Sequence, residues 1–318
     1  MSVNYRITVR GGQGDTLLQR AVKEELMQVN NELSAYESLS ELNQFNKTYD
    51  ANWIDISENL GKVFKEAYQI YTLTKGNFDP SVGKFVDLWG MGNNKTLRTP
   101  TAEEIEEAKK VVGFNKIIFS KNYRQAKKST PDISLNLSAM AKGYAVDRIA
   151  ALLEKSGYTD FVIEIGGAVY ARGKRAPKAK GWNIGIAKPD NDKIPTNAYV
   201  ISLKDMAVAT SGDYRNYFYI DGKRYSHTID PKTGYPVEHN LISITVFAKT
   251  AIYADALTTG MMTMGESKAL EFANVNKIAA VLFVRTEDGY QTLVSQEAQK
   301  YIKQDLLTRD QPAKEEKK

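Results

Sequence analysis

The sequence contains no cysteine in its 318 residues. This absence excludes disulfide bonds, thiolate metal ligands and cysteine nucleophiles within the chain, although it does not fix the compartment. Histidine is also scarce, so any proton transfer or metal binding by an imidazole must use His227 or His239.

Long hydrophobic runs are missing as well. No apolar stretch reaches the roughly 18 residues that span a bilayer, and the chain opens directly on the strand-like residues 3–9. We therefore expect either a cytosolic protein or an exported one whose signal segment is not part of this sequence.

Neither sign of charge dominates the chain. Lysine and arginine (43) are interleaved with aspartate and glutamate (38), and the formal net charge is +5. No basic stripe or base-stacking motif accompanies this charge, so a mixed, solvated surface is a better interpretation than nucleic-acid binding.

What the sequence does have is a mixture of helical and strand patterns. Leucine and valine recur at helical spacing over residues 17–33, and further helices are predicted at 57–75, 101–112, 141–155, 250–264 and 266–273. Strands are predicted at 161–165, 182–187, 199–203, 206–209 and 241–248, with hairpins that turn at Asp221-Gly222 and Asp288-Gly289. Because helices and strands mix without a regular alternation, we predict an α+β fold with a substantial antiparallel sheet.

Residues 76–83, GNFDPSVG, with LWG at residues 88–90, are rich in turn formers. Gly, Asn, Asp and Pro are common in tight turns, so a simple turn after a helix explains the segment as well as a binding site does. Phe78 and Asp79 would suit a planar ligand, because they place an aromatic ring and a carboxylate between two turns.

Residues 135–144, LNLSAMAKGY, place small side chains at the start of a predicted helix. Free amides and the helix dipole attract phosphate at such a start, and Lys142 adds a positive charge. The glycine spacing is not that of a P-loop, and a capped helix packed on the sheet is the alternative.

Residues 209–215, ATSGDYR, and 225–234, YSHTIDPKTG, place His227 beside hydroxyl groups and near Asp230. Histidine titrates near neutral pH and can carry a proton during a transfer reaction. A histidine in a strand is often only a hydrogen-bonded structural residue, so both interpretations remain open. His239, in a polar loop, is the weaker candidate.

Residues 253–260, YADALTTG, fall on a predicted helix. Asp255 and Thr259 are four positions apart and share one face, where they offer a carboxylate and a hydroxyl to a hard cation. Two oxygen ligands suit Mg²⁺ better than Ca²⁺, because Mg²⁺ shares its coordination with phosphates and water. A solvated surface pair is the alternative.

Taken in order, these segments resemble the ApbE family of FAD:protein FMN transferases. The similarity runs from Met1 to about residue 295 and includes the stretch at residues 36–46. Its motifs lie at residues 78–90, 138–147, 166–167, 209–215, 226–231 and 254–256. The resemblance implies one α+β unit, related to the T-fold, over residues 1–305. Residues 306–318 form a charged tail that we expect to be disordered.

The resemblance also implies a cleft that binds FAD with Mg²⁺. The metal would be held by Asp255, the Thr259 hydroxyl and the backbone carbonyl of Ala139. The residues that would contact FAD are Met1, Tyr36, Asn77, Phe78, Asp79, Asn136, Lys142 and Ile229. Asn136 stands where the family commonly has aspartate; a neutral amide still forms hydrogen bonds but adds no negative charge.

The implied activity is transfer of the FMN half of FAD to a serine or threonine hydroxyl of an acceptor flavoprotein, with release of AMP. His227 is the candidate base, and Asp230 is its orienting partner. The alternatives are hydrolysis of FAD to FMN and AMP, and FAD binding without catalysis. Tyr36 favours transfer, because an aromatic ring there shields the flavin from water, and the metal pair with His227 argues against a storage protein.

The family is exported and usually lipid-anchored at the outer face of the cytoplasmic membrane. The resemblance therefore implies a periplasmic lipoprotein whose signal lies upstream of this sequence, with no membrane contact other than the anchor. The acceptor would be a flavin-carrying subunit of a redox complex, or another extracytoplasmic electron carrier, with an Asp-Gly-x-Ser/Thr-Gly-Ala-Ser/Thr-like motif.

Overall fold

A seven-stranded antiparallel sheet forms the centre of the computed structural model, which describes residues 3–12, 15–48, 52–92, 96–188, 197–213 and 217–302. Its strands, in spatial order, are β1 (Tyr5–Val9), β5 (Phe161–Ile165), β6 (Ala168–Arg172), β9 (Met206–Gly212), β12 (Leu241–Ala248), β13 (Ala279–Thr286) and β14 (Gly289–Val294). Met1, Tyr214, Arg215 and the predicted tail at 306–318 lie outside the described residues.

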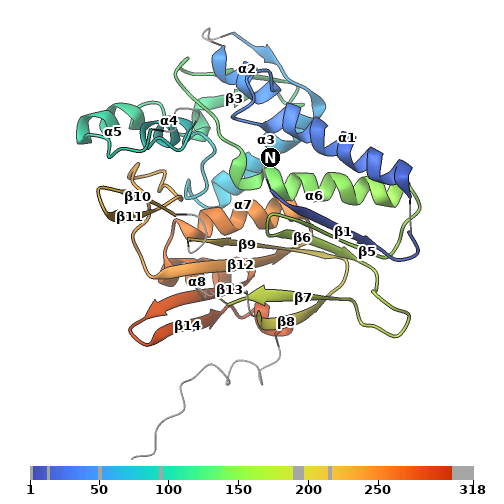
Figure 1. Cartoon of the computed structure of the whole chain (residues 1–318). Helices are drawn as coiled ribbons and strands as arrows, with labels where there is room; N and C mark the ends of the chain where they lie inside the picture. The colour runs from blue at the N-terminus through green and yellow to red at the C-terminus, as the bar shows by residue number, and fades with distance from the viewer. Residues whose placement is uncertain are drawn as a thin grey trace, which may run out of the picture.

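Both faces of the sheet are covered (Figure 1). Helices α6 (Ser138–Lys155) and α7 (Ala251–Met262) lie on one face, with α1 (Thr16–Leu33), α2 (Glu41–Lys47) and α3 (Glu58–Leu73) beyond them. The hairpin of β7 (Trp182–Ala187) and β8 (Asn197–Leu203) lies on the other face. Strand β13 alternates accordingly: Leu282 packs with the helices and Phe283 packs with the hairpin.

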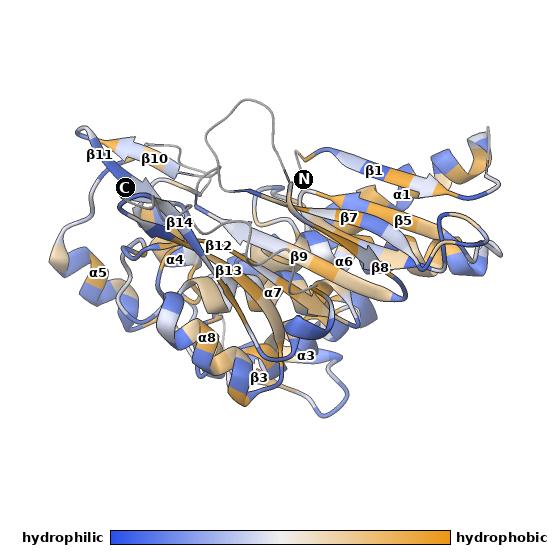
Figure 2. Ribbon diagram, turned by 90° about the horizontal axis from the view of Figure 1, so that it is seen from below, coloured by the Kyte–Doolittle hydropathy of each residue, from blue (hydrophilic) through white to orange (hydrophobic). Residues whose placement is uncertain are grey.

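Smaller elements surround this core. Helices α4 (Gly83–Leu88) and α5 (Ala102–Lys109) gather with the hairpin of β10 (Tyr217–Ile220) and β11 (Lys223–Ser226) at one side of the molecule in Figure 1. The remaining elements are α8 (Glu266–Val275), the small sheet of β2 (Ile54–Asp55), β4 (Gln125–Lys128) and β3 (Ile117–Phe119), and the 3₁₀ turns η1 (Phe114–Lys116) and η2 (Ala298–Lys300). Figure 2 shows hydrophobic residues concentrated on the central strands and α7, whereas the hairpin β10–β11 is largely hydrophilic.

The predicted α+β class and antiparallel sheet are confirmed. Each predicted helix is present, but α6 begins at Ser138, three residues before the prediction, because the side chain of Asn136 accepts a hydrogen bond from the Ser138 amide at 2.9 Å. Leu17, the first residue of the predicted helical pattern, is 77% exposed. The Asp221-Gly222 hairpin turn is also confirmed, with φ angles of 49° and 78°.

The sequence patterns did not predict α2, α4, β6 or the small three-stranded sheet. Each of these elements is too short to show a period: α2 has 7 residues and α4 has 6. Within the part of the chain that the structure describes, no helix has the length and apolar character needed to cross a membrane.

Candidate functional site

Helices α6 and α7 approach each other so closely at Gly143 that no side chain fits there. A Cβ atom on Gly143 would lie 2.2 Å from the carbonyl oxygen of Ala251. Because the two backbones nearly touch, short side chains on either helix reach the main chain of the other. This junction brings the predicted segments 135–144 and 253–260 together.

Asp255 lies at this junction and is 1% exposed. Its Oδ2 accepts a hydrogen bond from the Gly143 amide at 3.0 Å, and its Oδ1 lies 3.0 Å from Nζ of Lys142. In a regular helix the Gly143 amide donates to the carbonyl of Ala139, four residues earlier. Asp255 therefore competes for this donor with the Ala139 carbonyl, which the family resemblance implies as a metal ligand.

The oxygen atoms at the junction fit a hard divalent cation. Asp255 supplies one carboxylate and Ala139 a carbonyl with two lone pairs, while Thr259, partly buried, lies one helical turn beyond Asp255 on the same face. In the structure the ammonium group of Lys142 balances the charge of the buried Asp255 carboxylate. Among the described residues, no group of three or more His, Cys, Asp or Glu side chains could hold a metal ion. A cation here would therefore need substrate or water oxygens as further ligands.

A carboxylate that the sequence analysis did not assign, Asp147, holds the other end of the junction. Its Oδ1 and Oδ2 accept hydrogen bonds from the amides of Ala251 and Ile252 at 2.8 and 2.9 Å. Burial raises the pKa of Asp147 to about 6, and the nearby carboxylates of Glu66 and Asp255 act in the same direction. The only sequence signal for this residue is its place at the end of the 138–147 motif.

Helix α7 is also tied to strand β9 through hydroxyl groups. Thr258 Oγ1 lies 2.8 Å from Ser211 Oγ and donates to the Asp255 carbonyl at 2.7 Å. Ser211 belongs to the predicted 209–215 segment, so the structure places that segment beside the helix that carries Asp255.

Tyr36 and Asn136 line the same small hollow, whose volume is about 60 Å³. Side chains of helix α2 bind the backbone on both sides of this hollow. Asn43 donates to the carbonyls of Ala35 and Glu37. Asn46 donates to the Leu135 carbonyl at 2.9 Å and accepts from the Leu135 amide at 2.8 Å.

Asn136 is fixed by its own hydrogen bonds as well as by the bonds between Asn46 and the neighbouring Leu135. Its amide donates to Pro80 O at 2.7 Å, in addition to the bond that its side chain accepts from Ser138. Asp87 also lines the hollow, and burial raises its pKa. The sequence analysis missed Asp87 because it falls inside α4, a helix too short to be predicted.

In the 76–90 segment, the side chains of Phe78 and Asp79, which were predicted to contact the flavin, are buried and contact other residues of the protein. Phe78 is 2% exposed and packs closely on α7. A Cβ atom added to Gly260 of α7 would lie 2.8 Å from the Cβ of Phe78. Asp79 accepts from the amide and hydroxyl of Ser81, at 2.8 and 2.6 Å, and from the Phe114 amide at 3.3 Å. Burial raises the pKa of Asp79 to about 6. A role for these two residues in flavin binding stays a prediction.

The 226–237 segment packs on the 76–90 segment. Trp89 Nε1 donates to the Gly234 carbonyl at 2.9 Å, and Lys232 Nζ donates to the side chain of Asn77 at 3.1 Å. Asn77 O in turn accepts from Thr263 Oγ1, just after α7, at 2.8 Å. The structure thus brings the first, third and fourth predicted segments together.

His227 is exposed and directly follows β11, whereas Ile229, in the same segment, is 7% exposed and packs into the cluster around Trp89. Asp230 Oδ1 accepts from the Lys232 amide at 2.8 Å, which gives this carboxylate a part in shaping the turn. Its predicted part in orienting His227 stays a prediction, as do the contacts of Met1, which lies outside the described residues.

Comparison with known proteins agrees with this fold. The model of the ApbE family matches residues 1–283. The FAD:protein FMN transferase of Haemophilus influenzae is 42% identical over 271 residues, which cover 84% of this chain and 78% of that protein. The FAD:protein FMN transferase of Vibrio cholerae is 37% identical over 279 residues, which cover 87% of this chain and 82% of that protein.

Solved structures are similar over nearly the whole chain. The flavin transferase ApbE from Vibrio cholerae has a TM-score of 0.86 at 34% identity and covers 95% of this chain and 96% of that one. The apo form of the Pseudomonas stutzeri flavinyl transferase ApbE has a TM-score of 0.82 at 30% identity and covers 94% of this chain and 96% of that one.

Proposed function

The chain belongs to the ApbE family, and from this premise we propose that it transfers the FMN half of FAD to a serine or threonine hydroxyl of an acceptor flavoprotein. The observation that carries the proposal is the junction of α6 and α7. There a buried carboxylate, an ammonium group and the first turn of a helix lie together, which is the chemistry that a pyrophosphate with a divalent cation requires.

In the proposed reaction, the acceptor hydroxyl attacks the phosphorus on the FMN side of the pyrophosphate. The bond from that phosphorus to the bridging oxygen breaks, and AMP leaves with the bonding electron pair. His227 takes the proton of the hydroxyl, because an imidazole accepts a proton near neutral pH and this side chain is exposed to an incoming protein.

Asp255, Thr259 and the Ala139 carbonyl would hold Mg²⁺. When bound, Mg²⁺ neutralises charge on the pyrophosphate and on the leaving AMP. Lys142 lies 3.0 Å from Asp255 and can exchange this partner for a phosphate oxygen when FAD enters. Tyr36 and Asn136 hold the flavin side of FAD, and Tyr36 limits the access of water to it.

The acceptor we propose is a flavin-carrying redox protein with an Asp-Gly-x-Ser/Thr-Gly-Ala-Ser/Thr-like loop. The test is an incubation of the purified protein with FAD, Mg²⁺ and a carrier protein that bears this loop, followed by mass spectrometry of the carrier. We expect an added FMN that disappears with EDTA and with a carrier whose acceptor hydroxyl is replaced by alanine. Release of FMN and AMP without any labelled carrier would instead identify a hydrolase.

We also propose that the protein works at the outer face of the bacterial cytoplasmic membrane, held by a lipid anchor that an upstream segment supplies. Family membership supports this location. Cell fractionation with the full-length gene product tests it, and recovery of the protein in the cytosolic fraction would contradict it.

A further inference from the structure

We propose that Asp147 is a positioning residue for the cation site: by holding the start of α7 from α6, it sets the separation of oxygen ligands that the two helices contribute. The inference rests on the proposed function for the identity of those ligands. It concerns a residue that contacts neither the proposed cation ligands nor the proposed base.

The cap that Asp147 provides is unusual because it comes from another helix. Thr250 occupies the N-cap position of α7, yet its side chain makes no capping hydrogen bond. Both oxygens of Asp147 are used instead, on the consecutive amides of Ala251 and Ile252. Two bonds from one rigid carboxylate fix the direction of the helix as well as its position.

The ligands that would be positioned come from both helices. Ala139 belongs to α6, whereas Asp255 and Thr259 belong to α7. Asp255 reaches back to the Gly143 amide, so the two helices exchange carboxylate–amide bonds in opposite directions within about one turn. A movement of α7 relative to α6 would change the distance between the Ala139 carbonyl and the Asp255 carboxylate.

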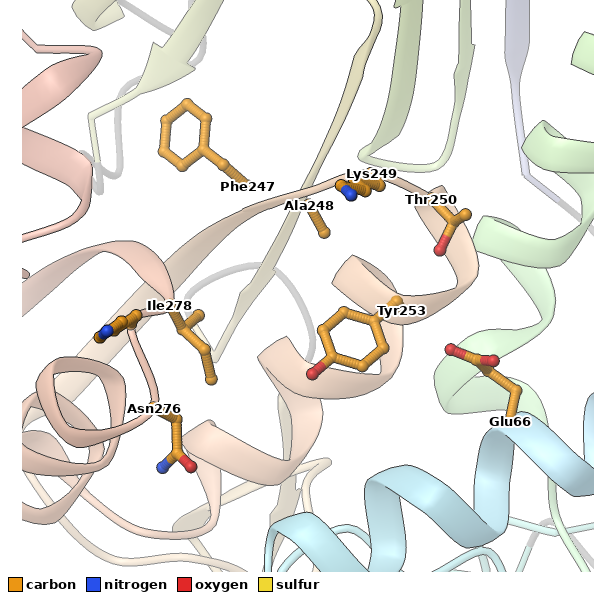
Figure 3. A pocket seen from close by; sticks show the side chains of 9 residues that line it. Glu66, Phe247, Ala248, Lys249, Thr250, Tyr253, Asn276 and Ile278 are labelled. Carbon is orange, nitrogen blue, oxygen red and sulfur yellow. The ribbon is translucent and has the colours of Figure 1, made fainter.

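On its other side, the start of α7 borders open space. Figure 3 shows Thr250 and Tyr253 at the beginning of this helix, with Glu66 of α3 across a hollow of about 360 Å³. On that side, Thr250 is exposed and Tyr253 is only partly buried. The bonds from Asp147 therefore add a directional link between this end of α7 and α6 to the packing of Ala251 against Gly143.

The test compares Asp147→Asn with Asp15→Asn in the full chain. Asp15 is a matched control, because it caps α1 by accepting from the Leu18 amide at 2.9 Å. Each substitution keeps the size of the side chain and one acceptor oxygen. FAD binding is followed by flavin fluorescence during a Mg²⁺ titration, and stability is followed by chemical unfolding.

We expect Asp147→Asn to raise the Mg²⁺ concentration for half-maximal FAD binding by about tenfold or more. A shift of α7 would change the spacing of the ligands, and loss of groups that orient metal ligands commonly costs about 10- to 100-fold in metal affinity. FAD binding in EDTA should stay within about twofold. Asp15→Asn should lower stability and leave the Mg²⁺ dependence unchanged. If the two variants lose stability alike and neither alters the Mg²⁺ dependence, Asp147 is only a cap and the proposal is overturned.

A second variant separates capping from positioning. Thr250→Asp, added to Asp147→Asn, gives α7 its own N-cap but not the link to α6. We expect it to recover stability without recovering the Mg²⁺ dependence; recovery of both would overturn the proposal.

Amide hydrogen exchange gives a readout that needs neither metal nor activity. Asp147→Asn should speed exchange at Gly143, whose amide donates to Asp255, as well as at Ala251 and Ile252. Faster exchange at Ala251 and Ile252 alone would overturn the proposal. If the native protein binds FAD without any need for Mg²⁺, the proposed function fails, and exchange at Gly143 still decides whether Asp147 positions the helices.

Discussion

Asp255 is the one carboxylate among the three proposed cation ligands. Because it is buried, its negative charge should contribute more to cation binding than the neutral oxygens of Thr259 and Ala139. The i, i+4 spacing of Asp255 and Thr259 in the sequence predicted that the two residues share one face of a helix. The structure confirms this, because both lie on α7. The partner of Asp255 was not predicted, because Lys142 lies on another helix and had been expected to contact FAD directly. Pairing across 113 positions leaves no local pattern in a sequence.

We predict that Asp255→Ala abolishes FMN transfer at ordinary Mg²⁺ concentrations. Thr259→Ala should weaken transfer and be partly rescued by more Mg²⁺, because it removes a neutral oxygen and not a charge. The rate of carrier labelling measures both effects, with EDTA and Mn²⁺ additions to the native protein as controls. Native-rate transfer by Asp255→Ala in metal-free buffer would show that the junction binds no essential cation.

His227 is exposed, so its replacement should leave the fold intact. We predict that His227→Ala lowers the rate of transfer by about 10² to 10⁴, the usual contribution of a general base, while FAD affinity changes by only a few fold. A quenched time course of carrier labelling measures the transfer rate, and fluorescence titration measures the FAD affinity. An unchanged rate would move the role of base to Asp230 or to solvent.

Asp79 makes stability depend on pH. Burial raises its pKa from the ordinary value of 3.8 to about 6, so the folded protein holds the proton more tightly than the unfolded chain does. Its contribution to stability is therefore complete below about pH 3.8 and is lost as the pH rises through about 6.

Asp79→Asn stays neutral and should gain stability relative to the native protein as the pH rises from about 4 to about 7. The relative gain should reach at most about 3 kcal/mol, at about 1.4 kcal/mol for each pKa unit. Urea unfolding of both proteins across this range measures it. Because Asp147 titrates in both proteins, the difference isolates Asp79; a difference that does not vary with pH would contradict the assignment.

At the scale of elements, the long helices and strands were predictable because each shows its own period. The elements that build the site are different: α2 and α4 are short, and their parts in it come from distant contacts, such as Asn46 with Leu135 across 89 positions. The same limit applies to the start of α7, whose cap lies 104 positions earlier in the chain. Local patterns predicted which segments matter, and only the folded chain shows how they are joined.

The α6–α7 contact leads to a prediction about Gly143→Ala. Alanine favours a helix over glycine by about 1 kcal/mol, but the added Cβ would lie 2.2 Å from the Ala251 carbonyl oxygen, which belongs to the backbone. We expect a net loss of about 2 kcal/mol in the free energy of unfolding, as for overpacked cores, together with weaker Mg²⁺-dependent FAD binding. Ser267→Ala, at an exposed position of α8, is the control for helix propensity alone. A stabilised Gly143→Ala would mean that the helices can separate at little cost.

At the scale of the whole molecule, the fold collects at one place segments that lie far apart in the sequence. The sheet supports the helix pair from below, and the 76–90 and 226–237 segments pack against each other near the end of α7. The α+β class was predictable from the mixture of patterns. The strand order was not, because pairs such as Ala168 with Ala209 join strands separated by a hairpin that crosses to the other face.

This arrangement predicts that the molecule distinguishes FAD from FMN. Lys142 and the oxygens at the α6–α7 junction would act on the pyrophosphate, which FMN and riboflavin lack, whereas Tyr36 would contact the flavin, which all three ligands share. At a hundredfold excess over its dissociation constant, FAD should stabilise the protein by about 2.7 kcal/mol. FMN at the same concentration should stabilise it much less.

Thermal unfolding with each ligand, and calorimetry for the dissociation constants, measure this preference. The advantage of FAD should shrink in EDTA and in Asp255→Asn, because both remove the part of the binding energy that depends on the pyrophosphate. Tyr36→Ala should instead weaken FAD and FMN alike, since it acts on the flavin that they share. Equal affinities for FAD and FMN in the native protein would mean that the helix junction does not contact the pyrophosphate, and the site would then have to lie elsewhere on the fold.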